Sequence, residues 1–153
     1  MDESFDLDGK TFVEQCLSER NLMLNASAVV WDRAALIDAL DESLEALKEY
    51  RLTGDWHLYA AAALQAPRVA YLSSPLNIHR RHESSVTASL NAHRHVEEVE
   101  RVHDFVAEEL DVDDTVRQRM REYADMLRRQ FGIATQTTPA DEDPALARNA
   151  DAP

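Results

Sequence analysis

The sequence contains little cysteine, glycine or proline, and it has no long hydrophobic run. Cys16 is the single cysteine, which rules out an internal disulfide or a cysteine-based zinc site and is typical of a reducing compartment. Three glycines and five prolines argue against an all-β fold. The longest apolar run, residues 58–64, is too short to span a membrane, and the acidic N-terminus has no signal-peptide pattern. We therefore expect a cytoplasmic protein without a transmembrane segment.

Positive charge is also scarce. The chain has 16 Lys and Arg against 29 Asp and Glu, a net charge of −13, which disfavours nucleic acid as a partner. Residues 51–89 are the exception, because their four arginines face only Asp55 and Glu83, and three of the six histidines lie there. We expect any ligand chemistry of this acidic chain to lie in that segment.

Hydrophobic periodicity predicts an α-dominant α+β fold with few short strands. Short helices are expected over 9–19, 33–48 and 56–65, with Asp32 and Asp55 as N-caps, and strands over 27–31, 68–72 and 76–80. Leu36, Leu40, Leu44 and Leu47 would form the apolar face of the second helix. Two longer helices follow, and the short break at 110–113 predicts an antiparallel hairpin. Their apolar faces would contain Val99, Val102, Val106 and Leu110 in the first and Val116, Met120, Tyr123 and Leu127 in the second.

Asp55 is the first candidate for chemistry. It stands between Gly54 and Trp56 at the predicted start of a helix, where a carboxylate is held firmly and can face a cleft. It could act as a general base that takes a proton from a hydroxyl group. The simpler interpretation is an N-cap, a role that aspartate commonly fills and that contributes about 1 kcal/mol.

A basic group follows the last predicted strand. Arg80 and Arg81 suit a phosphate, and His82 could bind a metal or a diphosphate. An exposed basic turn that pairs with acidic surface is the alternative. A zinc site of His79 and His82 with His93 or His95 is a weaker hypothesis, because thiolates are lacking.

Two other patterns have simpler explanations. Asp6-Leu7-Asp8 resembles a metal-binding Asp-x-Asp pair, but nothing before it predicts a strand that could present it, so we expect a solvated acidic terminus. Trp31, Tyr50 and Tyr59 are more typical of a core than of a sugar platform. Trp56 is the aromatic residue that we expect to serve in both.

Taken together, four pieces resemble the C-terminal half of family 2 glycosyltransferases of the GT-A fold. They are Asn21 to Arg33 with Asn25-Ala-Ser27, Tyr50 to Tyr59 with Gly54-Asp55-Trp56, Ala70-Tyr71-Leu72, and Pro75 to His82 with Arg80-Arg81-His82, closed by Ser85-Val86-Thr87. The match covers about residues 9–110. Each piece is short, and their order and spacing carry the resemblance.

The resemblance implies roles for these residues. Asp55 would be the catalytic base of an inverting transfer from a nucleotide-sugar donor to a hydroxyl acceptor. Arg80, Arg81 and His82 would lie near the donor diphosphate and its divalent metal, Mg or Mn, with His82 as a metal ligand. The acceptor side would contain Asn25, Ser27 and Trp56. The product would belong to a glycan or cell-surface polysaccharide.

Nothing before Asn21 corresponds to the nucleotide-binding half of that family. We expect a partial GT-A domain over 1–88, a helical hairpin over 89–132 and a disordered tail over 133–153. The chain alone should bind no metal tightly and should not transfer sugar. The alternative is a non-catalytic helical module for interaction or dimerisation. The strand edges expected at 27–31 and 69–72 predict self-association in either case.

Overall fold

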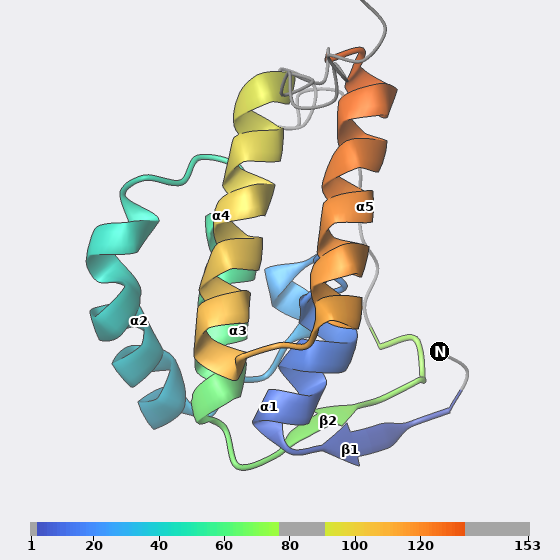
Figure 1. The fold of residues 1–153 in the computed structure, drawn as a ribbon. Coiled ribbons are helices and arrows are strands. Elements are labelled where there is room, and N and C mark those ends of the chain that lie inside the picture. Colours follow the sequence, from blue (N-terminus) through green and yellow to red (C-terminus); the bar gives the residue numbers. More distant parts are fainter. Residues whose placement is uncertain (1–2, 77–90, 134–153) are drawn as a thin grey trace, which may run out of the picture.

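Helices dominate the part of the chain that the computed structural model describes, residues 3–76 and 91–133, and the α-dominant α+β class is confirmed. In chain order the elements are β1 (Phe5–Leu7), α1 (Gly9–Phe12), a π-helical turn (Val13–Leu17), a 3-10 turn (Ala26–Ala28), α2 (Arg33–Leu47), α3 (Gly54–Gln65), β2 (Val69–Tyr71), α4 (Ala92–Leu110) and α5 (Asp114–Phe131). Figure 1 shows α4 and α5 side by side, α2 on the left and both strands together at one end.

Side-chain caps start several of the helices. Asp32 accepts hydrogen bonds from the backbone N–H groups of Ala34 and Ala35, at 2.9 and 3.0 Å, which confirms it as the N-cap of α2. Asp113 caps α5 by accepting from Val116 N–H at 2.8 Å. Because the backbone turns between Leu110 and Asp114, α4 and α5 form the predicted helical hairpin.

A sheet of two strands joins segments far apart in the sequence. β1 and β2 are antiparallel, with Leu7 opposite Val69, and the rings of Phe5 and Tyr71 stack at 5.1 Å. β2 confirms the strand expected at 68–72. The expectation that no strand presents Asp6 was wrong, because Asp6 lies in β1 and pairs with Arg68. A three-residue strand whose partner lies about sixty positions away leaves no local periodic signal.

The strand predicted over residues 27–31 was also wrong. Asn25 accepts a hydrogen bond from Ser27 N–H at 3.1 Å and starts the 3-10 turn instead. Val30 is 99% exposed, whereas Trp31 is half-buried and stacks on Tyr59 at 5.5 Å. The run of apolar residues therefore anchors a loop through one tryptophan. The strand predicted over 76–80 lies almost entirely outside the described residues.

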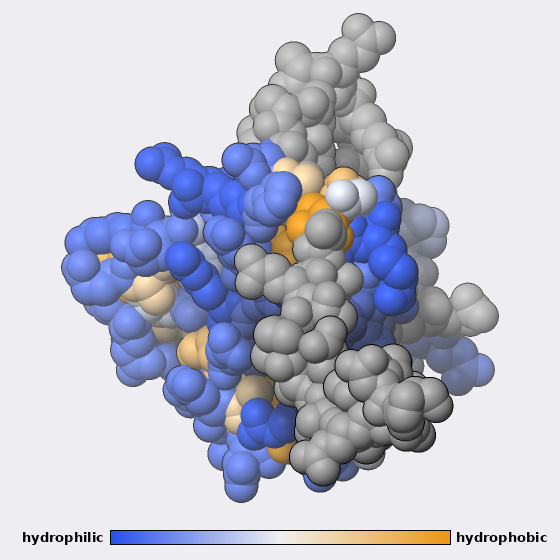
Figure 2. All heavy atoms as spheres, turned by 45° about the horizontal axis from the view of Figure 1, so that its top comes forward, coloured by the Kyte–Doolittle hydropathy of each residue, from blue (hydrophilic) through white to orange (hydrophobic). Residues whose placement is uncertain are grey.

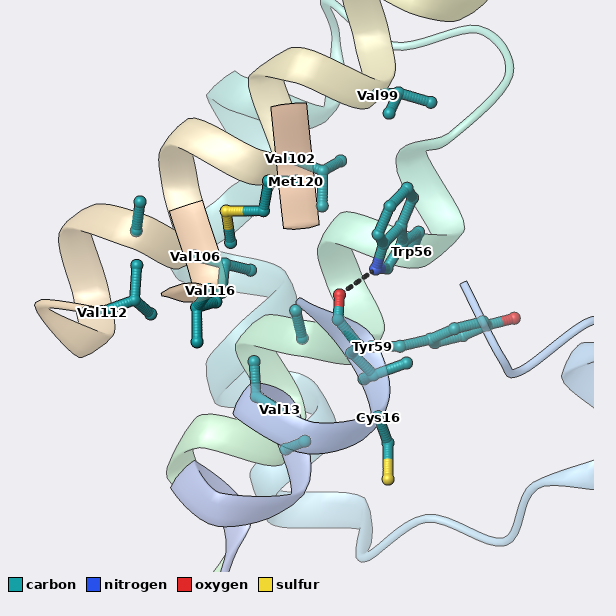
Figure 3. Close-up of a cluster of buried hydrophobic side chains, with 14 of the residues drawn as sticks. Val13, Cys16, Trp56, Tyr59, Val99, Val102, Val106, Val112, Val116 and Met120 are labelled. Atoms are coloured by element: carbon teal, nitrogen blue, oxygen red, sulfur yellow. Dashed lines mark hydrogen bonds between the residues drawn. The ribbon is translucent and has the colours of Figure 1, made fainter. Parts of the chain in front are cut away.

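One core unites the N-terminal half with the hairpin. Trp56 and Tyr59 of α3 pack with Val13 and Cys16 of the π-helical turn, and with valines of α4. Figure 3 shows these side chains converging with Val99, Val102 and Val106 of α4 and with Val116 and Met120 of α5. The buried members from the hairpin are Val96, Val99, Val102, Val106, Ala107, Val112, Val116, Met120 and Leu127. The hairpin is thus part of the same hydrophobic core as the segment that contains Asp55.

The apolar face predicted for α2 was only partly right. Leu40 and Leu44 are 39% and 50% exposed, and the buried positions are Ala39 and Ser43. Ala39 packs on Ala61 and Ala62 of α3, and such small side chains allow two helices to approach closely. Figure 2 shows a largely hydrophilic surface on which hydrophobic atoms emerge at separate places, among them the region of α2 at the left. Within the two described ranges, no helix combines the length and the apolar character needed to cross a membrane.

Candidate functional site

Asp55 lies in the first turn of α3 and not at its cap. The N-cap is Thr53, whose carbonyl accepts from His57 N–H at 3.2 Å, so the cap lies two residues before the predicted position. The Asp55 carboxylate keeps contact with solvent and accepts from Trp56 N–H at 2.7 Å. Partial burial raises the pKa of this carboxyl group, and the hydrogen bond from Trp56 N–H lowers it by less. A raised pKa makes the carboxylate a stronger base than an ordinary aspartate.

Trp56 anchors this turn from inside the protein. It is 2% exposed, and its indole N–H donates to the carbonyl of Leu17 at 2.8 Å, as the dashed line in Figure 3 shows. The ring of His103 meets it edge-on at 5.6 Å. The structure therefore contradicts the expectation that Trp56 also serves an acceptor sugar, because its ring is enclosed in the core. Its role is to hold the backbone next to Asp55.

A different aromatic pair accompanies Asp55. Tyr59 follows one helical turn later, so it lies on the same side of α3, and the charge of Asp55 adds to the effect of burial in raising the pKa of Tyr59. Trp31 stacks on Tyr59 and is half-buried, so part of the residue is accessible to solvent. Carbohydrates commonly bind against such accessible aromatic faces because the ring is both apolar and polarisable. Sequence reasoning treated Trp31 as a core residue and missed this position.

Glu98 is the second residue that sequence reasoning missed. It is 1% exposed, and its carboxylate accepts from three consecutive backbone N–H groups, those of Arg51, Leu52 and Thr53, at 2.9, 2.7 and 2.9 Å. Arg94 donates to it through Nε at 2.8 Å. Desolvation raises the pKa of Glu98, but these hydrogen bonds outweigh it and hold the pKa below the usual value. The available signal was a glutamate between Val96 and Val99, with Arg94 one turn before it.

His57 lies behind the turn and is also buried. Its ring packs on Phe105 at 4.2 Å and on Tyr50 at 5.2 Å, and the Tyr50 hydroxyl lies 3.4 Å from Nδ1. Burial lowers the pKa of His57, so the neutral ring is favoured. We assign it a packing role, because its side chain is closed off from solvent.

Asn25 and Ser27 form the 3-10 turn that precedes Trp31. The Asn25 side chain accepts from both the N–H and the hydroxyl of Ser27, the latter at 2.8 Å; Ser27 is exposed and Asn25 is half-buried. The loop that they start leads directly to the Trp31–Tyr59 stack. Their assignment to the acceptor side stays a prediction.

The predicted donor side lies outside the described residues. Arg80, Arg81 and His82 fall in the range 77–90, and so does His79 of the alternative zinc site. His93 is described and exposed, and His95 packs edge-on against Phe131 at 5.9 Å. Among residues 3–76 and 91–133, no group of three His, Cys, Asp or Glu side chains is placed to hold a metal ion.

A hollow lies between α4 and α5, beside His103, whose ring meets Trp56 of α3 edge-on. Its volume is about 330 Å³, and Glu100, Asp104, Arg117 and Arg121 line it together with His103. His103 hydrogen-bonds through Nε2 to the carbonyl of Glu19 at 2.9 Å, and Glu100 pairs with Arg128. Charges of both signs line the hollow, so it presents no clear preference for an anion or a cation.

Comparison of the chain with protein-family models, with curated proteins and with solved structures found no match.

Proposed function

We propose that this chain forms the acceptor and base half of an inverting glycosyltransferase. The observation that carries the proposal is the position of Asp55, which is a solvent-accessible carboxylate with a raised pKa in the first turn of a rigidly held helix. The resemblance of the Gly54-Asp55-Trp56 segment to family 2 glycosyltransferases supports the same role. The partly accessible Trp31 on the same side of α3 supports a carbohydrate as the acceptor.

In this proposal Asp55 removes the proton from an acceptor hydroxyl as its oxygen attacks the anomeric carbon of the donor. A new carbon–oxygen bond forms on one face of the sugar, and the bond to the diphosphate breaks on the other. The nucleoside diphosphate leaves with the electron pair, so the configuration inverts. A base in this position contributes about 10²–10⁴-fold in rate.

The donor side of the reaction requires groups beyond those just described. A divalent metal would neutralise the leaving diphosphate, and Arg80, Arg81 and His82 are the residues of this chain proposed to lie near it. The described residues offer no site of three ligands for that ion, so we assign the metal to none of them. Without a nucleotide-binding half, we expect the chain to show no measurable transfer.

The test supplies a nucleotide-sugar-binding half, either from the reading frame upstream of Met1 or as a separate chain, and compares Asp55→Asn with Asp38→Asn. Asp38 is an exposed aspartate of α2, so its substitution removes the same charge from a different helix. We expect Asp55→Asn to lower kcat by about 10²–10⁴-fold with unchanged donor affinity, and Asp38→Asn to have no effect. Full activity of Asp55→Asn would refute the assignment.

A second candidate function is a non-catalytic module that associates through α2. Ile37, Leu40 and Leu44 are each more than one-third exposed, and their spacing places them on one face of the helix. Such a face is suited to a second copy of the chain or to another helix. Light scattering of the purified chain, together with the transfer assay above, distinguishes the two candidates. The module is favoured if the chain associates as its concentration rises, if Asp55→Asn leaves that association unchanged, and if no donor half restores transfer.

A further inference from the structure

The segment before Asp55 obtains its hydrogen-bond acceptor from a distant helix. The N–H groups of Arg51, Leu52 and Thr53 all donate to Glu98 of α4, and the Thr53 hydroxyl lies 3.5 Å from the same carboxylate. Thr53 is the N-cap of α3, yet its own side chain makes no capping bond to the helix. Glu98 therefore fixes the backbone that leads into α3 and places a negative charge near the positive end of that helix.

Glu98 is also held by a partner within its own helix. Arg94 donates to it from one turn earlier in α4, and a second guanidinium nitrogen of Arg94 donates to the carbonyl of Glu49 at 3.2 Å. Val96 and Val99, on either side of Glu98 in the sequence, are both buried in the core. A charged group this deeply buried is retained only where hydrogen bonds satisfy it, so its position is sharply defined.

Asp55 lies between two such attachments. On the N-terminal side, Thr53 N–H is bound to Glu98 of α4, and on the C-terminal side the Trp56 indole is bound to the Leu17 carbonyl. Gly54 between them packs closely on Tyr50, because a Cβ atom there would lie 3.1 Å from the Tyr50 Cβ. The backbone of Asp55 is thus fixed relative to two different elements, as a general base requires.

We infer that Glu98 is a positioning residue for Asp55. Through Glu98, α4 would contribute to the geometry of the proposed acceptor site. This inference rests on the proposed function for its catalytic meaning. A local N-cap would stabilise α3 equally well, but it would leave the direction of α3 relative to α4 undefined. Glu98 fixes that direction, and with it the place from which the Asp55 carboxylate meets an acceptor.

The experiment compares Glu98→Gln with Glu97→Gln in the full chain. Glu97 is the exposed neighbour, so the control removes the same charge from the same helix. Amide hydrogen exchange reports on residues 51–53, with Val102 in the centre of α4 as an internal reference. A carbon-13 NMR pH titration reports on the Asp55 carboxyl group, and circular dichroism confirms that each variant is folded.

We expect exchange at Leu52 and Thr53 to become about 10- to 100-fold faster in Glu98→Gln, since hydrogen bonds to a charged acceptor are lost, while exchange at Val102 is unchanged. The Asp55 titration midpoint should shift toward that of an ordinary aspartate. Glu97→Gln should change neither. With a donor half present, Glu98→Gln should lower kcat and leave the KM for the donor unchanged.

An Asp55 titration that is the same in Glu98→Gln and in the native chain would overturn the inference, even with faster exchange, because Glu98 would then serve stability alone. Slow exchange at residues 51–53 in the variant would overturn it as well. If Glu98→Gln does not fold, Arg94→Gln provides the same readouts, because it leaves the carboxylate in place and removes its main side-chain partner. If Asp55→Asn does not reduce transfer, the proposed function is refuted. The exchange and titration results would still decide whether Glu98 positions Asp55.

Discussion

Gly9 provides the sharpest test of how the N-terminal segment is seated. A Cβ atom at this position would lie 1.8 Å from the backbone oxygen of Ala63 and 2.5 Å from that of Ala66. Both are backbone oxygens at the C-terminal end of α3, so they cannot move aside as the end of a flexible side chain could. Gly9→Ala therefore requires α1 to shift away from α3 by more than 1 Å.

Such a shift would open the core between α1 and α3. Phe12, Val13 and Leu17 are all buried, and the Leu17 carbonyl is the acceptor that holds Trp56 beside Asp55. Inserting an extra carbon into a packed core typically costs 1–3 kcal/mol, and a clash with rigid backbone lies at or above the top of that range, at about 3 kcal/mol. For a folded region of this size, the midpoint of thermal unfolding should fall by about 10 °C.

The other two glycines of the chain serve as matched controls. Gly54→Ala should change stability by less than about 1 kcal/mol, because the nearest atom to the added Cβ, at 3.1 Å, is a side-chain carbon of Tyr50 and alanine favours the helix. Gly132→Ala meets no atom within 4 Å but has a φ of +66°, so it should cost about 1–2 kcal/mol. Thermal and denaturant unfolding of the three variants should rank Gly9→Ala as the most destabilised. If Gly9→Ala unfolds no earlier than Gly132→Ala, α1 is not seated against α3 as described.

Three further predictions concern the core, the pH response and the surface. Trp56→Phe should lower the free energy of unfolding by about 1–3 kcal/mol, because it leaves the Leu17 carbonyl without its donor, and denaturant unfolding should show a smaller loss for Trp31→Phe. Burial lowers the pKa of His57, His95 and His103, so the stability from keeping them neutral is complete above their ordinary pKa near 6.5 and is lost as the pH falls below it. Unfolding by guanidinium chloride, measured at several pH values between 7 and 5, should therefore show a free energy of unfolding that falls before ordinary carboxylates titrate. A free energy of unfolding that does not change over this range would contradict the burial of these rings. Leu40→Lys with Leu44→Lys should reduce any self-association measured by light scattering without lowering the unfolding temperature, whereas Asp38→Asn, which changes charge but removes no apolar surface, should leave association as it was.

The parts of the fold that the sequence predicted are those with long periodic patterns. Val99, Val102 and Val106 in α4, and Val116 and Met120 in α5, repeat at helical spacing over several turns and are all buried. The α2 helix was also predicted correctly in extent, because Asp32 gives a clear start. Its buried face was not, because a contact between alanines carries little hydrophobic signal and the more hydrophobic leucines lie beside it.

Most features that were missed depend on contacts between distant segments. β1 exists because β2 pairs with it, and residues 27–31 form a loop because the Trp31 ring stacks on Tyr59. In the candidate site, the position of Asp55 at the start of α3 was foreseen to within two residues. The choice of Trp56 over Trp31 as the accessible aromatic was wrong, since neither burial nor stacking partner can be read from a residue's immediate neighbours. The assignments of Asn25, Ser27, Arg80, Arg81 and His82 stay predictions.

The pairing of Glu98 with residues 51–53 has a consequence for the order in which the chain acquires its shape during synthesis. The acceptor follows its donors by 45 to 47 positions, so the ribosome completes the whole of α3 and β2 before α4 supplies the carboxylate. Until then the three amides of residues 51–53, which lead into α3, can bind only water, and the first turn of the helix is free to fray. A chain that ends prematurely between residues 66 and 97 would contain Gly54, Asp55 and Trp56 in full and would still lack the partner that sets their geometry.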